Sequence, residues 1–175
     1  QSDIQVSYFN GLGVLSWENI FGTWNQLTAR DAEALRRVGT ILRFFGKRGF
    51  FTTQHWIPHS SEMLQMSTGV FGSAFSISRD DGTRETVYTI INRRPNATGV
   101  SPQIRPNITA KERSVLRFYD CYRGQQLHLD PVSQALWFEV EAGGYGCVVA
   151  TPNATDTEAM SAPLLPDNVI RGPIK

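Results

Sequence analysis

The order of apolar and polar positions divides the chain into a short N-terminal part with a helical period and a longer part with a period of two. Residues 4–9 alternate well enough to predict a strand or the approach to one. A second apolar run, at Val14 and Leu15, precedes an amphipathic helix of about 17 residues. The apolar residues of this helix recur at spacings of three and four, at Leu35, Val38, Leu42 and Phe45. Strand, polar loop and helix together predict one βα unit.

Polar residues and a glycine mark the ends of the predicted helix. Thr28 is a suitable N-cap, and Asp31 is placed to complete a capping box while favouring the positive end of the helix. Gly46 is the natural stop. The side of the helix that faces water is predicted to hold three basic residues, Arg36, Arg37 and Arg43.

From Gly69 onward the period changes to two, which predicts β-strands. Two strands, at 69–77 and 85–92, flank the pair Asp81-Gly82, and this arrangement predicts a β-hairpin. Further strands are predicted at Val115–Cys121, Gln126–Leu129, Gln134–Glu141 and Tyr145–Thr151. Short strands at this spacing, without helices between them, are typical of an antiparallel β-sandwich. The fold class is therefore predicted to be mainly β, a sandwich preceded by one βα unit.

The remaining segments are rich in Pro, Asn or small polar residues. Pro58 disfavours regular structure before the β part, and residues 93–111 form a Pro- and Asn-rich excursion within it. The βα piece leaves an apolar helix face and a sheet edge without partners, so it must pack on the β domain or on a larger body. We expect a βα piece at 1–50, a connector at 51–66, the β domain at 67–151, and a tail at 152–175 that lies along the surface or is partly disordered.

Composition and charge are those of an ordinary globular chain. The 175 residues include 17 basic and 16 acidic side chains, for a net charge of +1, and the basic ones are dispersed apart from pairs such as Arg93-Arg94. This distribution does not favour a nucleic acid or an anionic membrane as partner. No apolar run approaches the roughly 20 residues that span a bilayer. The first residues, Gln1-Ser2-Asp3, contain neither an initiator Met nor a secretory leader, so we expect a processed or excised product.

Three sequons and one pair of cysteines favour a secreted, extracellular glycoprotein. Asn96, Asn107 and Asn153 each begin an Asn-x-Thr motif in a loop-like context, which predicts N-glycosylation, although unmodified surface loops would have the same pattern. Cys121 and Cys147 are an even pair, compatible with one disulfide in that compartment or with two buried free thiols.

Glu18 is the leading candidate for a catalytic residue. It follows a predicted strand, and in βα units the working side chains lie at the carboxyl end of the strand. Glycoside cleavage requires two carboxylates that flank the bond, and no partner for Glu18 is evident. Asp31 is predicted to cap a helix, and the other acidic candidates lie on or beside predicted strands, namely Asp120, Glu139 and Glu141.

Other chemistry has little support in the sequence. Motifs for phosphate binding, serine hydrolysis and zinc binding are missing, so no cofactor or metal is expected. His55 and His59 are four residues apart, but Pro58 disfavours the helix that would place them on one face. Both histidines are expected to be structural or surface residues.

Aromatic residues provide faces on which sugar rings can stack. The predicted substrate-binding residues are Trp17, Asn19, Trp24 and Trp56. The alternative is that these aromatic side chains attach the helix to the β domain. Trp137 and Tyr145 fall on predicted strands and are assigned to the core.

Several blocks of the chain, taken in order, resemble a known family. The first contains Phe9-Asn10-Gly11-Leu12-Gly13, Ser16-Trp17-Glu18-Asn19-Ile20-Phe21-Gly22-Thr23-Trp24-Asn25 and the residues from Thr28 to Arg37. Later blocks are Tyr88-Thr89-Ile90-Ile91-Asn92-Arg93, Phe118-Tyr119-Asp120 with Gly124, and Gly143-Gly144-Tyr145-Gly146. In this order they are similar to the C-terminal portion of glycoside-hydrolase-like proteins, in which a (β/α)8 barrel is followed by an antiparallel β-sandwich.

The resemblance implies a late βα unit of the barrel at residues 5–45 and the C-terminal sandwich at residues 67–151. Glu18 would then face the active-site mouth of the barrel. The preceding βα units are not in this chain, so an N-terminal chain or domain is expected to complete the barrel. Cys121 and Cys147 occupy strand positions where apolar residues are expected, which implies a disulfide particular to this secreted relative.

The leading prediction is therefore the C-terminal fragment of a secreted glycoside-hydrolase-like protein, in which the sandwich supports the barrel. Its reaction would be hydrolysis of a glycosidic bond by carboxylate acid/base chemistry, with Glu18 contributing one group, and the isolated chain is expected to be inactive. The alternative is a non-catalytic extracellular module that binds carbohydrate or has a structural role. In both cases carbohydrate is the expected ligand.

Overall fold

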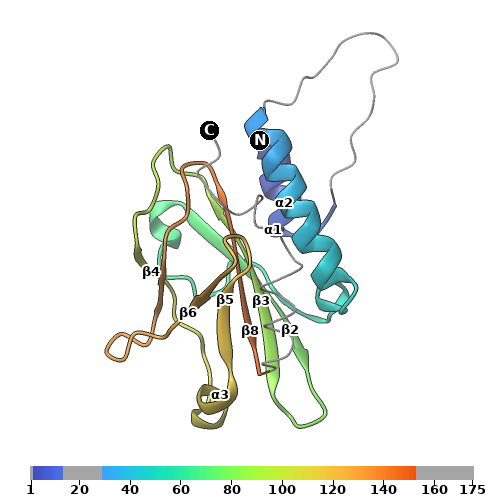
Figure 1. Ribbon diagram of the computed structural model, residues 1–175, viewed down its shortest axis with the longest axis vertical. Coiled ribbons are helices and arrows are strands. Elements are labelled where there is room, and N and C mark those ends of the chain that lie inside the picture. The colour runs from blue at the N-terminus through green and yellow to red at the C-terminus, as the bar shows by residue number, and fades with distance from the viewer. Residues whose placement is uncertain (1, 14–28, 153–175) are drawn as a thin grey trace.

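The computed structural model describes residues 2–13 and 29–152, which form a mainly β fold (Figure 1). The helices are α1 (Ser2–Phe9), α2 (Ala29–Gly46) and α3 (Ala110–Val115), with short 3-10 helices η1 (Phe50–Thr52) and η2 (Met66–Thr68). The strands are β1 (His55–Ile57), β2 (Val70–Ser78), β3 (Arg84–Asn92), β4 (Ser101–Ile104), β5 (Arg117–Asp120), β6 (Gln125–Leu127), β7 (Leu136–Phe138) and β8 (Tyr145–Thr151).

Six strands form one antiparallel sheet in the order β1-β2-β3-β8-β5-β6, and β4 pairs with β7 in a second, two-stranded sheet. The predicted hairpin is confirmed: β2 and β3 pair from Val70 opposite Asn92 to Ser78 opposite Arg84. Gly82 has a φ of 76°, which a glycine in the tight turn adopts without steric cost. β8, the last strand in the sequence, lies between β3 and β5.

Both faces of the six-stranded sheet are covered. Figure 1 shows α1 and α2 on one side of the sheet and β4 on the other. Neighbouring residues of β3 alternate between two cores, because Val87 packs under the helices and Tyr88 packs under the two-stranded sheet. We call these the helix-side core (with Tyr8, Val38, Phe45, Cys147 and Tyr145 among its members) and the strand-side core (with Tyr88, Ile90, Ile104, Leu136 and Val148 among its members).

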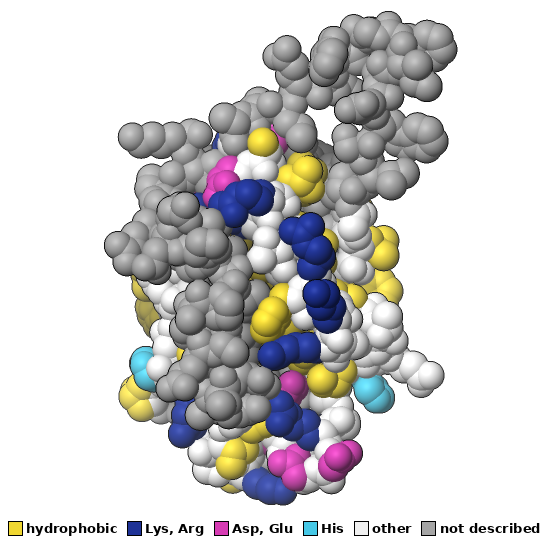
Figure 2. Space-filling model, turned by 45° about the vertical axis from the view of Figure 1, so that its right-hand side comes forward, with side chains coloured by type: hydrophobic (Ala, Val, Ile, Leu, Met, Phe, Trp, Pro, Cys, Tyr) yellow, Lys and Arg dark blue, Asp and Glu magenta, His cyan; other side chains and the backbone are white. Residues whose placement is uncertain are grey.

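Helix α2 confirms the predicted helix and its apolar stripe. Val38, Ile41 and Phe45 are fully buried in the helix-side core, and burial of each such side chain contributes about 1.5–3 kcal/mol. The Phe45 ring meets Phe50 edge to face, with centroids 5.5 Å apart. The outer side of α2 carries exposed basic residues, and Figure 2 shows Lys and Arg side chains in a row down this face of the molecule.

The prediction that Arg37 faces water is wrong, because this residue is only 5% exposed. Its Nε donates a hydrogen bond of 2.8 Å to Glu33 Oε1, and its guanidinium lies over the Tyr122 ring, 5.4 Å from the centroid. A buried guanidinium is tolerated only with such partners. In the sequence of α2, Arg37 is next to the apolar residues that face the sheet. The contact between helix and sheet is broad enough to bury it as well.

The prediction of a strand at residues 4–9 is also wrong, because these residues belong to α1. Ile4, Tyr8 and Phe9 are buried on the side that faces the sheet. The Tyr8 hydroxyl donates to the Gly146 carbonyl (2.8 Å), and the Thr89 hydroxyl donates to the Phe9 carbonyl (3.1 Å). Six residues are too few to distinguish a period of two from a period of 3.6, and contact with the sheet selects the helix.

Two segments predicted to lack regular structure contain some. In the connector, β1 pairs with β2 and ends at Ile57, immediately before Pro58, so the proline interrupts no pairing. Helix α3 precedes β5, contrary to the prediction that no helix separates the strands. Its capping box joins Thr109 and Glu112 in both directions, and the sequence Thr-Ala-Lys-Glu has this pattern. Within the described ranges, none of the helices has the length and apolarity needed to cross a membrane.

Candidate functional site

The predicted catalytic residue and most predicted substrate-binding residues lie outside the residues that the structure describes. These are Trp17, Glu18, Asn19 and Trp24, which belong to the interval 14–28. The predicted tail beyond Pro152 lies outside them too. In the sequence, the interval 14–28 separates α1 from α2, and both helices contribute side chains to the helix-side core.

Trp56 is the predicted sugar-binding residue that the structure places. It lies on β1, at one edge of the six-stranded sheet, and is 42% exposed. Its ring is stacked on Phe75, with centroids 6.1 Å apart and planes inclined by 13°. Phe51 packs edge-on against Phe75 (4.9 Å), which fixes the ring that supports Trp56. One face of the indole is therefore held by the protein while much of the side chain remains open to solvent.

A second set of aromatic contacts lies near this edge. The His59 ring is 4.9 Å from the Phe9 ring and 5.6 Å from the Phe71 ring. His59 is exposed and has a φ of 49°, in the left-handed region. His55 is exposed on β1, so both histidines are surface residues. Among the described residues, no cluster of His, Cys, Asp and Glu is suited to hold a metal ion.

Two strand aromatics assigned to the core have different positions. Tyr145 is buried in the helix-side core, as predicted. Trp137 on β7 is 45% exposed, and its Nε1 donates to Ser133 Oγ (3.3 Å), so the prediction for Trp137 is wrong. Leu136 and Phe138, which flank Trp137 on β7, are buried in the strand-side core. The Trp137 side chain therefore points away from that core.

The structure places two of the three sequons. Asn96 and Asn107 are exposed, and Asn153 lies outside the described residues. The backbone at Asn107 is held on both sides, because its N–H donates to Glu62 Oε1 (2.9 Å) and its carbonyl accepts from Arg84 (2.6 Å). Both described sequons are accessible to a modifying enzyme, and their glycosylation stays a prediction.

Cys121 and Cys147 lie side by side in the helix-side core as buried free thiols. The pairing of β5 with β8 continues to this position, where the Cys121 N–H donates to the Cys147 carbonyl (2.8 Å). Burial, followed by the neighbouring Cys147 thiol, raises the pKa of Cys121 above its ordinary value. The predicted disulfide would join residues that already face each other, and it stays a prediction.

Two of the acidic residues considered as partners of Glu18, Asp120 and Glu139, make structural contacts. Asp120 is buried, and its Oδ1 accepts from the N–H groups of Tyr122 (2.9 Å) and Arg123 (3.0 Å). Desolvation raises the pKa of Asp120 to about 6, in spite of these hydrogen bonds. Glu139 forms an ion pair with Arg123 (3.2 Å). Because Asp120 is enclosed and Glu139 is paired, the described residues do not provide a free second carboxylate at either position.

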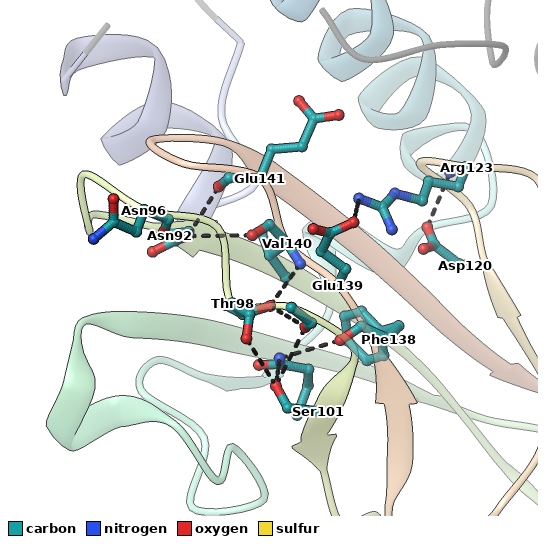
Figure 3. A network of polar contacts seen from close by, with 12 residues as sticks. Asn92, Asn96, Thr98, Ser101, Asp120, Arg123, Phe138, Glu139, Val140 and Glu141 are labelled. Carbon is teal, nitrogen blue, oxygen red and sulfur yellow. Dashed lines mark hydrogen bonds and ion pairs between the residues drawn. The ribbon is translucent and has the colours of Figure 1, made fainter.

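A polar network holds the loops at one end of the sheet (Figure 3). Asn92 is buried at the end of β3, and its Nδ2 lies within hydrogen-bond distance of the carbonyls of Asn96 (3.0 Å), Val140 (3.2 Å) and Glu141 (2.9 Å). Thr98 and Val140 exchange two further hydrogen bonds, of 2.9 and 3.0 Å. One buried amide therefore fixes the loop after β3 to the loop before β8.

Helix α1 is attached to the same loops and completes the wall of a pocket. Gln5 Nε2 lies within hydrogen-bond distance of the carbonyls of Asn92 (3.1 Å), Gly143 (3.0 Å) and Gly144 (3.3 Å). Next to it is a pocket of about 400 Å³, whose described lining consists of Gln5, Arg30, Arg93, Arg94, Pro95, Ala142 and Gly143.

Sequence reasoning did not select these lining residues. The pair Arg93-Arg94 was visible in the sequence, but only the structure brings Arg30 from α2 to the same place. No protein-family model matches the chain, and comparison with curated proteins gives no significant match.

Proposed function

We propose that the chain is the C-terminal portion of a secreted glycoside-hydrolase-like protein, in which the β domain is a sandwich that supports a (β/α)8 barrel. One observation carries this proposal: α1 and α2 share a single apolar core with the six-stranded sheet. The N-terminal piece is therefore not independent of the β domain. A supporting domain needs such an attachment, because a barrel segment joined only by a linker would gain no rigidity from its neighbour.

The attachment is extensive and specific. Side chains from α1, α2 and η1 are fully buried against residues of β2, β3 and β8, among them Tyr8, Val38, Ile41, Phe45, Phe50 and Val87. Two hydrogen bonds, from Tyr8 to β8 and from Thr89 to α1, fix the position of α1 on the sheet. The sequence around Glu18 thus runs between two helices that are both fixed to the sheet.

In this proposal Glu18 supplies one carboxylate and the N-terminal part of the barrel supplies the other. Acid/base cleavage of a glycosidic bond needs both groups on opposite sides of the bond. The chain alone is then inactive, and its glycosidic activity requires the remaining βα units. Secretion and glycosylation belong to the same proposal and are supported by the exposure of Asn96 and Asn107.

The test uses the longer protein with its N-terminal part, assayed against a panel of glycosides and polysaccharides. Glu18→Gln is expected to lower kcat/KM by a factor of about 10³ or more, because it removes a charge that acts in the transition state. Glu139→Gln is the matched control, since it removes a carboxylate whose partner is Arg123. Equal loss in both variants, or full turnover in Glu18→Gln, would refute the catalytic role.

A second candidate function has its own observation. Trp56 is a half-exposed indole held against Phe75 at a sheet edge, which is the arrangement of a platform for a sugar ring. We therefore keep a non-catalytic carbohydrate-binding module as the alternative.

Affinity electrophoresis in polysaccharide gels separates this alternative from the first proposal. If Trp56 is the platform, Trp56→Ala abolishes retardation in a gel that retards the wild type, whereas Trp137→Ala, which removes a similarly exposed indole on β7, preserves it. Retardation that is the same in wild type and Trp56→Ala, or absent from every gel, would remove Trp56 as a binding residue.

A further inference from the structure

The pocket beside α1 has an unusual charge content. Arg30, Arg93 and Arg94 line it, and none of its described lining residues is acidic. The side chains of Arg93 and Arg94 make no hydrogen bond or ion pair within the described chain. Two guanidinium groups therefore contribute positive charge to one concavity, with donors that no described residue engages.

Arginines elsewhere in the described chain contrast with this pair. Arg37 and Arg36 share Glu33, Arg79 is paired with Glu85, and Arg123 is paired with Glu139. Arg84 donates to the Asn107 carbonyl, and Arg105 donates to the Ser133 carbonyl. Most other guanidinium groups of the described chain thus have acceptors on the protein, although Arg43 on the outer side of α2 is also exposed without one. The pocket differs from that position in bringing two open guanidinium groups to one concavity.

The walls of the pocket are fixed before any ligand arrives. Arg30 donates to the Ala142 carbonyl, and Gln5 is held by the carbonyls of Asn92 and Gly143. The Arg94 N–H donates to Asn92 Oδ1 (2.9 Å), and the Gly143 N–H donates to the Arg94 carbonyl (2.9 Å). Such preorganisation lowers the entropy cost of binding.

A buried hydroxyl also has open hydrogen-bonding capacity, two residues after the lining residue Gly143. Tyr145 is 4% exposed, and its hydroxyl has no hydrogen-bond partner among the described residues. Burial raises the pKa of Tyr145 to about 12, with Asp31 raising it further and Arg30 lowering it, so the hydroxyl is within electrostatic reach of Arg30. It stays protonated at neutral pH and keeps its donor.

We propose that this pocket binds an oxyanion group, either a carboxylate or a sulfate, carried on a small organic molecule. Guanidinium forks match the geometry of such oxyanions and form charge-assisted hydrogen bonds with them. The volume of about 400 Å³ exceeds what a bare ion fills and lies within the roughly 300–1,000 Å³ of small-molecule sites. The inference does not depend on glycosidic activity or on Trp56.

The test is a titration of the isotope-labelled 175-residue chain, followed by NMR at constant ionic strength. The probes are sodium glucuronate, sodium sulfate and, as the neutral counterpart of the first, glucose. Saturable shifts are expected with glucuronate at the N–H of Gly143 and the Nε–H of Arg93 and Arg94, and none with glucose. Binding of sulfate but not glucuronate would overturn a carboxylate as the bound group, and unsaturable or dispersed shifts with all probes would overturn the site.

Matched variants localise the effect. The double variant Arg93→Gln with Arg94→Gln is expected to weaken glucuronate binding at least tenfold, since it removes both open guanidinium groups. Arg43→Gln removes an exposed arginine on the outer side of α2 and is expected to leave the affinity within twofold. Equal weakening in both proteins would show a general charge effect and refute the site. Unchanged thermal unfolding of the double variant excludes loss of fold as the cause.

Discussion

On one face of the six-stranded sheet, α1 and α2 bury tyrosines, cysteines and an arginine together with apolar residues. On the other face, β4 and β7 cover a core of mainly aliphatic side chains. The strand-side core contains one buried tyrosine, Tyr88, whose hydroxyl donates to Glu62 (2.5 Å). Within the described part of the chain, the hydroxyls of Tyr122 and Tyr145 on the helix side have no hydrogen-bond partner, nor does Oε1 of the buried Gln103 on β4.

The two cores differ in the chemistry of their side chains. A core of mainly aliphatic side chains contributes stability that does not depend on redox state. A core that contains thiols, phenols and a buried guanidinium has groups that redox state, or a ligand at its margin, can affect. The candidate pocket is lined from α1 and α2, and Trp56 stacks on Phe75 of the helix-side core, so we expect function to be concentrated on this side.

The largest expected effect comes from removing one large side chain on each side. Phe45→Ala should lower the free energy of unfolding by about 3–5 kcal/mol, and Leu136→Ala by about 2–5 kcal/mol. Hydrogen exchange followed by mass spectrometry should show faster exchange in α2 for the first variant and in β4 and β7 for the second. Val132→Ala, at an exposed position, is the control. Loss of protection on both sides in both variants would mean that the two cores are not separable.

The next effect concerns the two cysteines, which belong to the helix side alone. If the secreted protein forms the Cys121–Cys147 disulfide, closing a loop of about 26 residues should stabilise it by about 3 kcal/mol relative to the reduced form. Non-reducing peptide maps should show the linked peptides, and a reductant should lower Tm. The double variant Cys121→Ala with Cys147→Ala should be insensitive to reductant. Two titratable thiols in the freshly secreted protein would contradict the disulfide.

On the strand side, the free energy of unfolding is expected to depend on pH because of Asp120, which lies opposite Val148 in the sheet. Its pKa is about 6 in the folded protein against 3.8 for the free side chain, so the folded state binds the proton more tightly. Stability from this group is fully present below pH 3.8 and is lost as pH rises through 6, by about 2–3 kcal/mol in total. Asp120→Asn keeps an acceptor for the two N–H groups and avoids the buried charge.

Urea unfolding at several pH values tests this sign. Asp120→Asn should be more stable than the wild type at pH 8 and nearly equal to it at pH 4. Asp120→Ala, which also loses the acceptor of the turn, should be less stable at both values. If the Asn variant is no more stable than the wild type at pH 8, the buried carboxylate is not a cost to the fold.

The smallest effect concerns Thr109, which has two roles. It caps α3 through Glu112 and is also the third residue of the sequon that begins at Asn107. Thr109→Ala should lose about 1 kcal/mol of stability and any glycan at Asn107. Asn107→Gln should lose the glycan alone, and Thr109→Ser should keep both. Intact masses and unfolding curves of the three variants give the comparison, and identical masses before and after deglycosylation of the wild type would show that the site is unmodified.

Much of the fold could be predicted from the sequence because its strongest patterns are local. The β2–β3 hairpin follows from two alternating runs around an Asp-Gly pair, and α2 follows from a long apolar stripe. The helical conformation of α1 could not be predicted in the same way. Residues 4–9, the last six of this helix, fit two periods, and the choice between them depends on contacts with Thr89 and Gly146, which are distant in sequence.

The candidate site was less predictable for the same reason. Trp56 could be selected by residue type, but its support by Phe75 depends on strand pairing. The pocket depends on Gln5 and Asn92, two neutral amides whose importance comes from burial and from the carbonyls around them. Exposure of Trp137 and burial of Arg37 likewise follow from which surfaces meet, and a pattern within one element does not specify its neighbour.

The position of β8 has a consequence for how the protein is made. This strand is the last of the sheet to be synthesised, yet it pairs with β3 on one side and β5 on the other. Until residues 145–151 leave the ribosome, the β1–β2–β3 group and the β5–β6 pair have no strand between them, and each presents an open edge. Folding of this domain is therefore expected to finish late and to favour chaperone contact during synthesis, since long-range pairing must wait for the end of the sheet.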